Sequence, residues 1–160
     1  MSFTAEIKHF AQVLGIHKIG IAQVTTLDEE EKKIKDWLAR GYHGTMAWMN
    51  RNIEKRSDIR NILPNALSVI SVALNYYTAH THEKNYATGK ISRYAWGDDY
   101  HDILTPKLHA LLKWITDKNP DTKGKVYVDT GPVLEKVWAQ KAGIGWQGKH
   151  TNIISKEFGS

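Results

Sequence analysis

An almost uninterrupted apolar run in the middle of the chain sets the strongest limit on its fold. The sequence ALSVISVALNYY covers residues 66–77, and residues 69–74 are apolar apart from Ser71. Short runs of this kind, rich in β-branched side chains, are typical of strands that are covered on both faces. We therefore expect a buried central strand, with other elements packed on two sides of it.

Periodic segments on either side of this run predict those other elements. Apolar spacing and terminal Gly or Pro signals predict four helices, over residues 5–15, 26–39, 99–119 and 132–145. Short β-branched segments predict further strands over residues 17–24, 125–129 and 151–155. The order predicts an α/β fold, with α+β as the alternative: a mixed sheet flanked by helices in one compact domain over 1–160, with 78–92 as a surface loop.

One helix start carries a specific prediction. Thr26 and Glu29 have the spacing of a capping box, so we expect the second helix to begin there.

Composition narrows the class of protein. The chain lacks a run of about 20 apolar residues and a secretory signal, so we expect a soluble, cytoplasmic protein that does not contact a membrane. With no cysteine among 160 residues, it can form neither a disulfide nor a thiolate metal site. A net charge of +5 favours polyanionic partners, although only Arg51, Lys55, Arg56 and Arg60 lie close together in sequence.

The segment VDTGPVLEKVW places a carboxylate at a turn. Asp129 ends a predicted strand, and Gly131 and Pro132 lead into a predicted helix. Open α/β sheets bind ligands at such positions, where a carboxyl with a raised pKa can serve as a general acid. Aspartate is also favoured as a helix N-cap, and the residues alone leave both interpretations open.

Two further segments combine glycine, aromatic and basic residues. GIGWQGK allows a close approach of backbone to a ligand, but it also fits a helix end followed by a turn. GKISRYAWGDDYHD contains Arg93, Tyr94, Trp96, Tyr100 and His101. Such side chains suit a large planar ligand or stacked bases, and they equally suit a strand and turn whose aromatic residues belong to the core.

Four ordered blocks of sequence resemble the epoxyqueuosine reductase family. They are GYHGTMAWMNRN, KRSDIRNILPNALSVISVALNYY, GKISRYAWGDDYHDIL and VDTGPVLEKVWAQKAGIGWQGKHTNIIS, which together span residues 41–155. The resemblance implies that this chain is the N-terminal cobalamin-binding part of an oxidoreductase. Members of the family use cobalamin and two 4Fe-4S clusters to reduce epoxyqueuosine to queuosine in the anticodon arm of tRNA.

The resemblance also implies roles for individual residues. The aspartate of VDTGPVLE corresponds to the proton donor of the family, which makes Asp129 the expected catalytic residue. No protein side chain is expected to ligate cobalt, so no metal ligand is predicted in this segment. The predicted cobalamin contacts are Arg56, Arg93, Tyr94, Tyr100, His101, Trp146, Lys149 and Asn152.

The chain departs from the family pattern in one respect. The cysteine motif that binds the clusters is missing, so we expect this segment to be inactive without an iron–sulfur half. The electron donor is not identifiable from the sequence. Two other functions fit the residues: a non-catalytic RNA-binding module, based on the positive charge and the aromatic segment, and a related corrinoid reductase that acts on another substrate.

Overall fold

The structure is a computed structural model that describes residues 1–83 and 85–159. Its α-helices and strands, in chain order, are α1 (Phe3–Val13), β1 (Lys18–Gln23), α2 (Asp28–Ala39), α3 (Ile53–Ser57), β2 (Ser68–Ala73), α4 (Tyr100–Lys118), α5 (Glu135–Lys141), β3 (Trp146–Gln147) and β4 (Ile153–Ile154). Three short 3-10 helices are η1 (Ala47–Asn50), η2 (Ile59–Asn61) and η3 (Arg93–Ala95).

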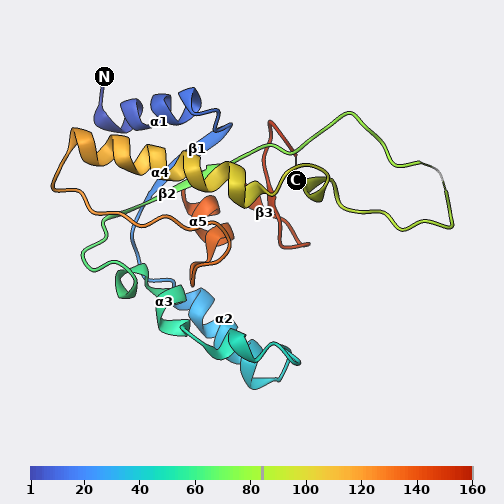
Figure 1. Cartoon of the computed structure of the whole chain (residues 1–160). Coiled ribbons are helices and arrows are strands. Elements are labelled where there is room, and N and C mark those ends of the chain that lie inside the picture. The colour runs from blue at the N-terminus through green and yellow to red at the C-terminus, as the bar shows by residue number, and fades with distance from the viewer. Residues whose placement is uncertain (84, 160) are drawn as a thin grey trace.

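Strands β1 and β2 form an antiparallel pair at the centre of the molecule, with Lys18 opposite Ala73 and Gln23 opposite Ser68. Helices α1 and α4 lie side by side over one face of this pair (Figure 1). Helix α5 packs against both strands, and Figure 1 places it away from α1 and α4. The fold is therefore α+β, the alternative named above, and each sheet in the described residues has two antiparallel strands.

Alternation along the strands explains why both faces are covered. Ile70 and Val72 of β2 pack against the cluster formed by α1 and α4, whose buried residues are Ile7, Ala11, Ile16, Leu111 and Ile115. Val69 packs instead against a second cluster of Ala22, Leu27 and Trp138, to which α5 contributes. The prediction of a strand covered on both faces is confirmed. The prediction that this strand is central in its sheet is wrong, because β2 pairs only with β1 among the described strands.

A glycine allows α5 to approach the sheet closely. A Cβ atom built on Gly20 of β1 would collide with the backbone carbonyl of Ala142, at the C-terminal end of α5. Because backbone atoms cannot move aside as a flexible side chain can, this position requires glycine. The contact fixes α5, and with it the residues at its N-terminal end, against β1.

Three local predictions are wrong. Residues 125–129, all of which the structure describes, form no strand and pair with neither sheet of the described chain. Helix α2 begins at Asp28 with Leu27 as its N-cap, and the Thr26 hydroxyl donates to the Asp28 carboxylate instead of forming a capping box. Helix α5 begins at Glu135, three residues later than Pro132.

Two segments extend from this core. Residues 78–83 and 85–92 form no helix or strand, and this part of the chain reaches far out from the helices in Figure 1. Helices α2 and α3 contact one another and project below the rest of the molecule in Figure 1. None of the helices that the structure describes is long and apolar enough to cross a membrane.

Candidate functional site

Asp129 lies at a tight turn between α4 and α5. The Thr130 N–H donates to the Val128 carbonyl at 2.6 Å, which closes a three-residue turn around Asp129. The backbone of Asp129 has φ 56°, in the left-handed region that aspartate tolerates better than most residues with a side chain.

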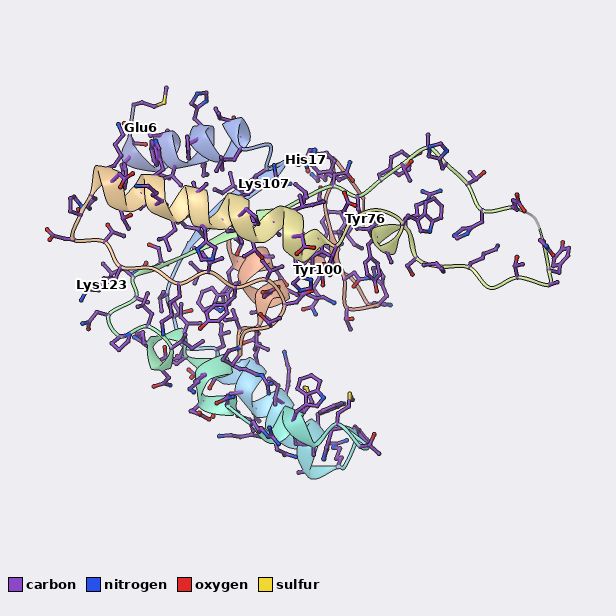
Figure 2. All side chains as sticks on the ribbon, in the orientation of Figure 1. Glu6, His17, Tyr76, Tyr100, Lys107 and Lys123 are labelled. Carbon is purple, nitrogen blue, oxygen red and sulfur yellow. The ribbon has the colours of Figure 1, made fainter. Side chains whose placement is uncertain are left out.

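The first residues of two helices meet at this turn. The Tyr100 hydroxyl, at the start of α4, donates a hydrogen bond to Oδ2 of Asp129. The Asp129 N–H donates to Oε1 of Glu135, at the start of α5, over 3.0 Å. Figure 2 shows Tyr100 at the end of α4, where the ribbon turns toward the extended loop. Asp129 is thus held by its side chain and by its main chain, from two different helices.

The helix-cap interpretation of Asp129 does not describe this geometry. The N-cap of α5 is Leu134, and in the described chain no side chain caps that helix end by a hydrogen bond. The carboxylate of Asp129 is instead engaged by the phenol of Tyr100.

Burial and neighbouring charges alter the acidity of the two partners. Burial raises the pKa of Glu135 to about 7 against the hydrogen bond from the Asp129 N–H, which lowers it. The Asp129 carboxyl adds to the rise, whereas His101 opposes it. The hydrogen bond to Asp129 raises the pKa of Tyr100 to about 12. Tyr100 therefore remains a donor at physiological pH, and Glu135 exchanges a proton near neutrality.

A solvent-accessible pocket of about 330 Å³ opens beside the turn. Its walls combine apolar side chains from the start of α5 with polar groups, and it is lined by Asp129, Val133, Leu134, Glu135, Lys136, Val137 and Gln147. The volume is at the lower end of the range for small-ligand pockets. Such a pocket can take the edge of a larger planar molecule that lies across its open side.

The structure places the other predicted residues of α4 and η3 near the start of α4. His101 stacks on Tyr100 with ring centroids 4.2 Å apart, and its Nδ1 lies 2.7 Å from Oδ1 of Asp99, the N-cap of α4. Arg93 lies over the rings of Tyr77 and Trp96, at 5.3 and 5.8 Å from their centroids.

Tyr94 completes this aromatic group. Its ring meets that of Tyr76 edge to face, with centroids 6.4 Å apart. Tyr94 is 57% exposed and Tyr76 is 53% exposed, so these rings are available to a ligand and are not core residues.

The hairpin of β3 and β4 carries three more predicted residues. Trp146 pairs with Ile154 across the hairpin and is 47% exposed, and Lys149 lies exposed in the turn. Oδ1 of Asn152 accepts a hydrogen bond from Lys136 of α5 at 3.1 Å. Through this contact and through Gln147, the hairpin reaches the same pocket as Asp129.

Arg56 lies elsewhere, on α3. Its Nη1 donates to the Met49 carbonyl at 2.8 Å, and its guanidinium lies over the Trp48 ring at 5.8 Å. The structure thus groups Asp129 with Tyr100 and His101, places the hairpin beside the pocket, and puts Arg56 on the projecting α2–α3 part of the chain.

Glu135 is the site residue that the sequence did not predict. An acidic residue in the first turn of a helix complements the helix dipole, which is a sufficient explanation when only the sequence is known. The available signal was its setting, since Val133, Leu134 and Val137 surround it with apolar side chains. A carboxylate within such an apolar run is expected to be shielded from water, and Glu135 lies only six residues after Asp129.

Comparisons with known proteins agree with one another. The family described as epoxyqueuosine reductase QueG, DUF1730, matches residues 56–130. An epoxyqueuosine reductase of Atelocyanobacterium thalassa is 48% identical over all of this chain and 52% of its own length. That of Synechocystis is 52% identical over 89% of this chain and 49% of its own length, and that of Escherichia coli is 40% identical over 97% and 42%.

Solved structures show the same relationship. The epoxyqueuosine reductase of Streptococcus thermophilus matches 99% of this chain and 43% of its own, with a TM-score of 0.86 and 34% identity. An epoxyqueuosine reductase solved with an epoxyqueuosine-modified tRNA-TYR stem loop gives a TM-score of 0.87 at 31% identity, over 98% of this chain and 42% of its own. The chain spans about half the length of the relatives it matches.

Proposed function

Because this chain belongs to the epoxyqueuosine reductase family, we propose that it forms the cobalamin-binding part of an enzyme that reduces epoxyqueuosine to queuosine in tRNA. The observation that carries the proposal is the Asp129 carboxylate, held by Tyr100 at the wall of an open pocket. The tRNA substrate is supported by the relative solved with a modified tRNA stem loop.

The pocket is compatible with a corrin ring. Val133, Leu134 and Val137 offer an apolar wall to the ring, while Lys136 and Gln147 can hydrogen-bond to amide groups at its edge. Tyr94, Tyr100 and His101 extend this surface on one side, and Trp146, Lys149 and Asn152 extend it on the other. Arg93 lies beside the aromatic residues near the start of α4. Arg56 lies on α3, so only a part of cobalamin that extends well beyond the ring could contact it.

Asp129 would act as the proton donor. Reduction of the epoxide to an alkene consumes two electrons and two protons, and the oxygen leaves as water. Cobalamin, when bound, supplies electrons to the substrate. Asp129 would supply the first proton, which converts the epoxide oxygen into a hydroxyl, and the hydrogen bond from Tyr100 keeps the carboxyl oriented during that step. The second proton, drawn from solvent, would convert the hydroxyl into the water that leaves.

The chain provides no cysteine for the clusters that would deliver these electrons. We therefore propose that residues 1–160 bind cobalamin but do not turn over without an iron–sulfur half. Two experiments test these proposals separately. The first concerns the pocket and cofactor binding, and the second concerns Asp129 and proton transfer.

Cobalamin binding is tested by titrating this chain with cob(II)alamin and following the absorbance change. We expect a saturable change that Leu134→Lys, which places a charge on the apolar wall, abolishes. Glu29→Gln, an exposed change on α2, serves as the control and should bind like the unmodified chain. If neither the chain nor an enzyme that includes the iron–sulfur half shows the change, the cobalamin proposal is wrong.

The role of Asp129 is tested in an enzyme that includes the iron–sulfur half. Asp129→Asn keeps an acceptor for Tyr100 and tolerates the left-handed backbone, but it cannot donate the proton. We expect reduction of epoxyqueuosine in tRNA to fall by about 100-fold or more, with cobalamin still bound. Activity close to that of the unmodified enzyme would show that Asp129 is not the acid.

The two other functions make different predictions. An RNA-binding module would bind tRNA with a strong salt dependence and would give no spectral change with cobalamin. A corrinoid reductase with another substrate would bind cobalamin yet leave epoxyqueuosine in tRNA unreduced even with the iron–sulfur half present.

A further inference from the structure

The main-chain N–H of Asp129 has a defined acceptor outside its own turn. The turn itself is closed by Thr130 and Val128, and it does not use the Asp129 N–H. That donor instead meets Oε1 of Glu135 at 3.0 Å. A left-handed backbone at a residue with a side chain costs about 1 kcal/mol, so the turn persists only where surrounding contacts favour it.

Glu135 is well placed to supply such a contact. It is the first residue of α5, and Trp138, one turn later, is 1% exposed and packs with Ala22 and Leu27. The far end of α5 is fixed by the close approach of Ala142 to Gly20. Helix α5, and with it the backbone of Glu135, is therefore anchored to the core at Trp138 and at Ala142. The turn that contains Asp129 belongs to no helix or strand.

We propose that Glu135 is a positioning residue that holds Asp129 in its left-handed turn through the main-chain N–H. The carboxyl of Asp129 is then kept at the pocket wall, within reach of Tyr100. The inference rests on the proposed role of Asp129 as proton donor and adds to it a residue that acts through Asp129.

A structural role in α5 is the competing explanation. Glu135 lies in the first turn of that helix, where its negative charge stabilises the helix dipole whatever happens at Asp129. The two roles need different properties of the side chain. The dipole requires a negative charge near the helix end, whereas the turn requires an acceptor oxygen at the distance that a glutamate side chain spans.

Two conservative variants separate these roles. Glu135→Gln keeps the length and an acceptor oxygen but removes the charge, and Glu135→Asp keeps the charge but is one methylene shorter. Positioning predicts that the Gln variant behaves like the unmodified protein and that the Asp variant fails. The dipole role predicts the reverse order.

The direct measurement is amide hydrogen exchange of the segment around residues 128–131, made on this chain and independent of turnover. We expect Glu135→Ala and Glu135→Asp to accelerate exchange there by about 10-fold, the effect of losing one hydrogen bond, while Glu135→Gln does not. Exposed Glu29→Ala on α2 is the control, and circular dichroism confirms that each variant is folded.

The second measurement is kinetic, in an enzyme that includes the iron–sulfur half. We expect Glu135→Ala and Glu135→Asp to lower kcat by about 10- to 100-fold with KM and cobalamin affinity unchanged, because the acid is displaced but the pocket remains. Glu135→Gln should restore most of kcat.

The inference and the proposed function fail in distinguishable ways. Unchanged exchange in both Glu135→Ala and Glu135→Asp, or a Gln variant that is as impaired as the Ala variant, would overturn the positioning role. An active Asp129→Asn enzyme would instead refute Asp129 as the acid, whatever the exchange at residues 128–131 shows.

Discussion

The phenol of Tyr100, the first residue of α4, donates a hydrogen bond to the carboxylate of Asp129, in the turn that precedes α5. The contact joins residues 29 positions apart in sequence. It fixes the direction of a carboxylate whose backbone is held separately by Glu135.

Removing this phenol should impair catalysis and leave the fold intact. In an enzyme with the iron–sulfur half, we expect Tyr100→Phe to lower kcat by about 10-fold, since the hydrogen bond that orients the acid is lost. Tyr42→Phe, which removes a hydroxyl from an exposed tyrosine outside the site, is the control. Equal kcat values for Tyr100→Phe and the unmodified enzyme would show that Asp129 needs no support from α4.

The same contact predicts a late tyrosine ionisation. The pKa of Tyr100 is raised to about 12 because its hydroxyl donates to Asp129. Ultraviolet titration of the folded chain should therefore contain a tyrosine that ionises near pH 12, and Asp129→Ala should move that tyrosine toward its ordinary value. If no tyrosine ionises later than its ordinary range, the Tyr100–Asp129 contact is absent in solution.

Glu135 should make the stability depend on pH near neutrality. Its folded pKa of about 7 lies above the ordinary value of 4.5, so the native state binds more protons than the unfolded state between these values. Its contribution is therefore most favourable below pH 4.5 and is lost as pH rises to 7, by at most about 3 kcal/mol. The Asp129 carboxyl and the His101 imidazole both lie close enough to Glu135 to act on its pKa.

The measurement is urea unfolding across that interval, compared between the unmodified chain and Glu135→Gln. The Gln variant cannot ionise, so the difference between the two free energies of unfolding should grow in its favour as pH rises from 4.5 to 7. A constant difference would mean that Glu135 is not shielded from water. The comparison cancels contributions from carboxylates elsewhere, such as Glu157, whose pKa is lowered by Lys18.

Gly20→Ala should destabilise the chain strongly. The added methyl collides with the Ala142 backbone, so β1 and α5 must separate. We expect a loss of about 2 kcal/mol or more in the free energy of unfolding. Gly97→Ala is the control, since no atom of the described chain lies within 4 Å of its added Cβ, and it should change stability by less than about 0.5 kcal/mol.

Trp138 offers a test of the second core cluster. Its indole is 1% exposed, and its N–H has no hydrogen-bond partner among the described residues. Trp138→Ala should cost about 3–5 kcal/mol through the cavity it leaves. Trp138→Phe should cost much less, because it keeps most of the apolar contacts and removes the unpaired donor. Similar losses for both variants would show that the N–H is satisfied in solution.

Local patterns predicted the elements that bury an apolar face, and they failed where a partner had to be known. The run of residues 69–74 gave a strand covered on both faces because alternation along β2 determines which side chains meet α5. Residues 125–129 have the same β-branched character, yet they pair with no strand of the described chain. The strand propensity of a residue reflects how well its side chain packs against neighbouring strands, and the sequence alone does not show which segments become those neighbours.

The site was predictable to the same extent. Asp129 and Tyr100 were both expected from the family resemblance, but their mutual contact was not, because it depends on how α4 is placed over the turn. Glu135 was missed because its helical position already explained an acid there. Arg56 was predicted to contact cobalamin because of the sequence block in which it lies. It lies on α3, in the segment between β1 and β2 that leaves the sheet.

That excursion has a consequence for assembly. Pairing of β1 with β2 closes a loop over residues 24–67, and α4 and α5 both contribute to clusters that pack on this pair. Loop closure of this length is an entropic barrier that local helix formation does not lower. The arrangement around Asp129 therefore depends on the pairing of two strands that lie far from it in sequence. A substitution that slows this pairing should delay formation of the site, even when it touches none of the site residues.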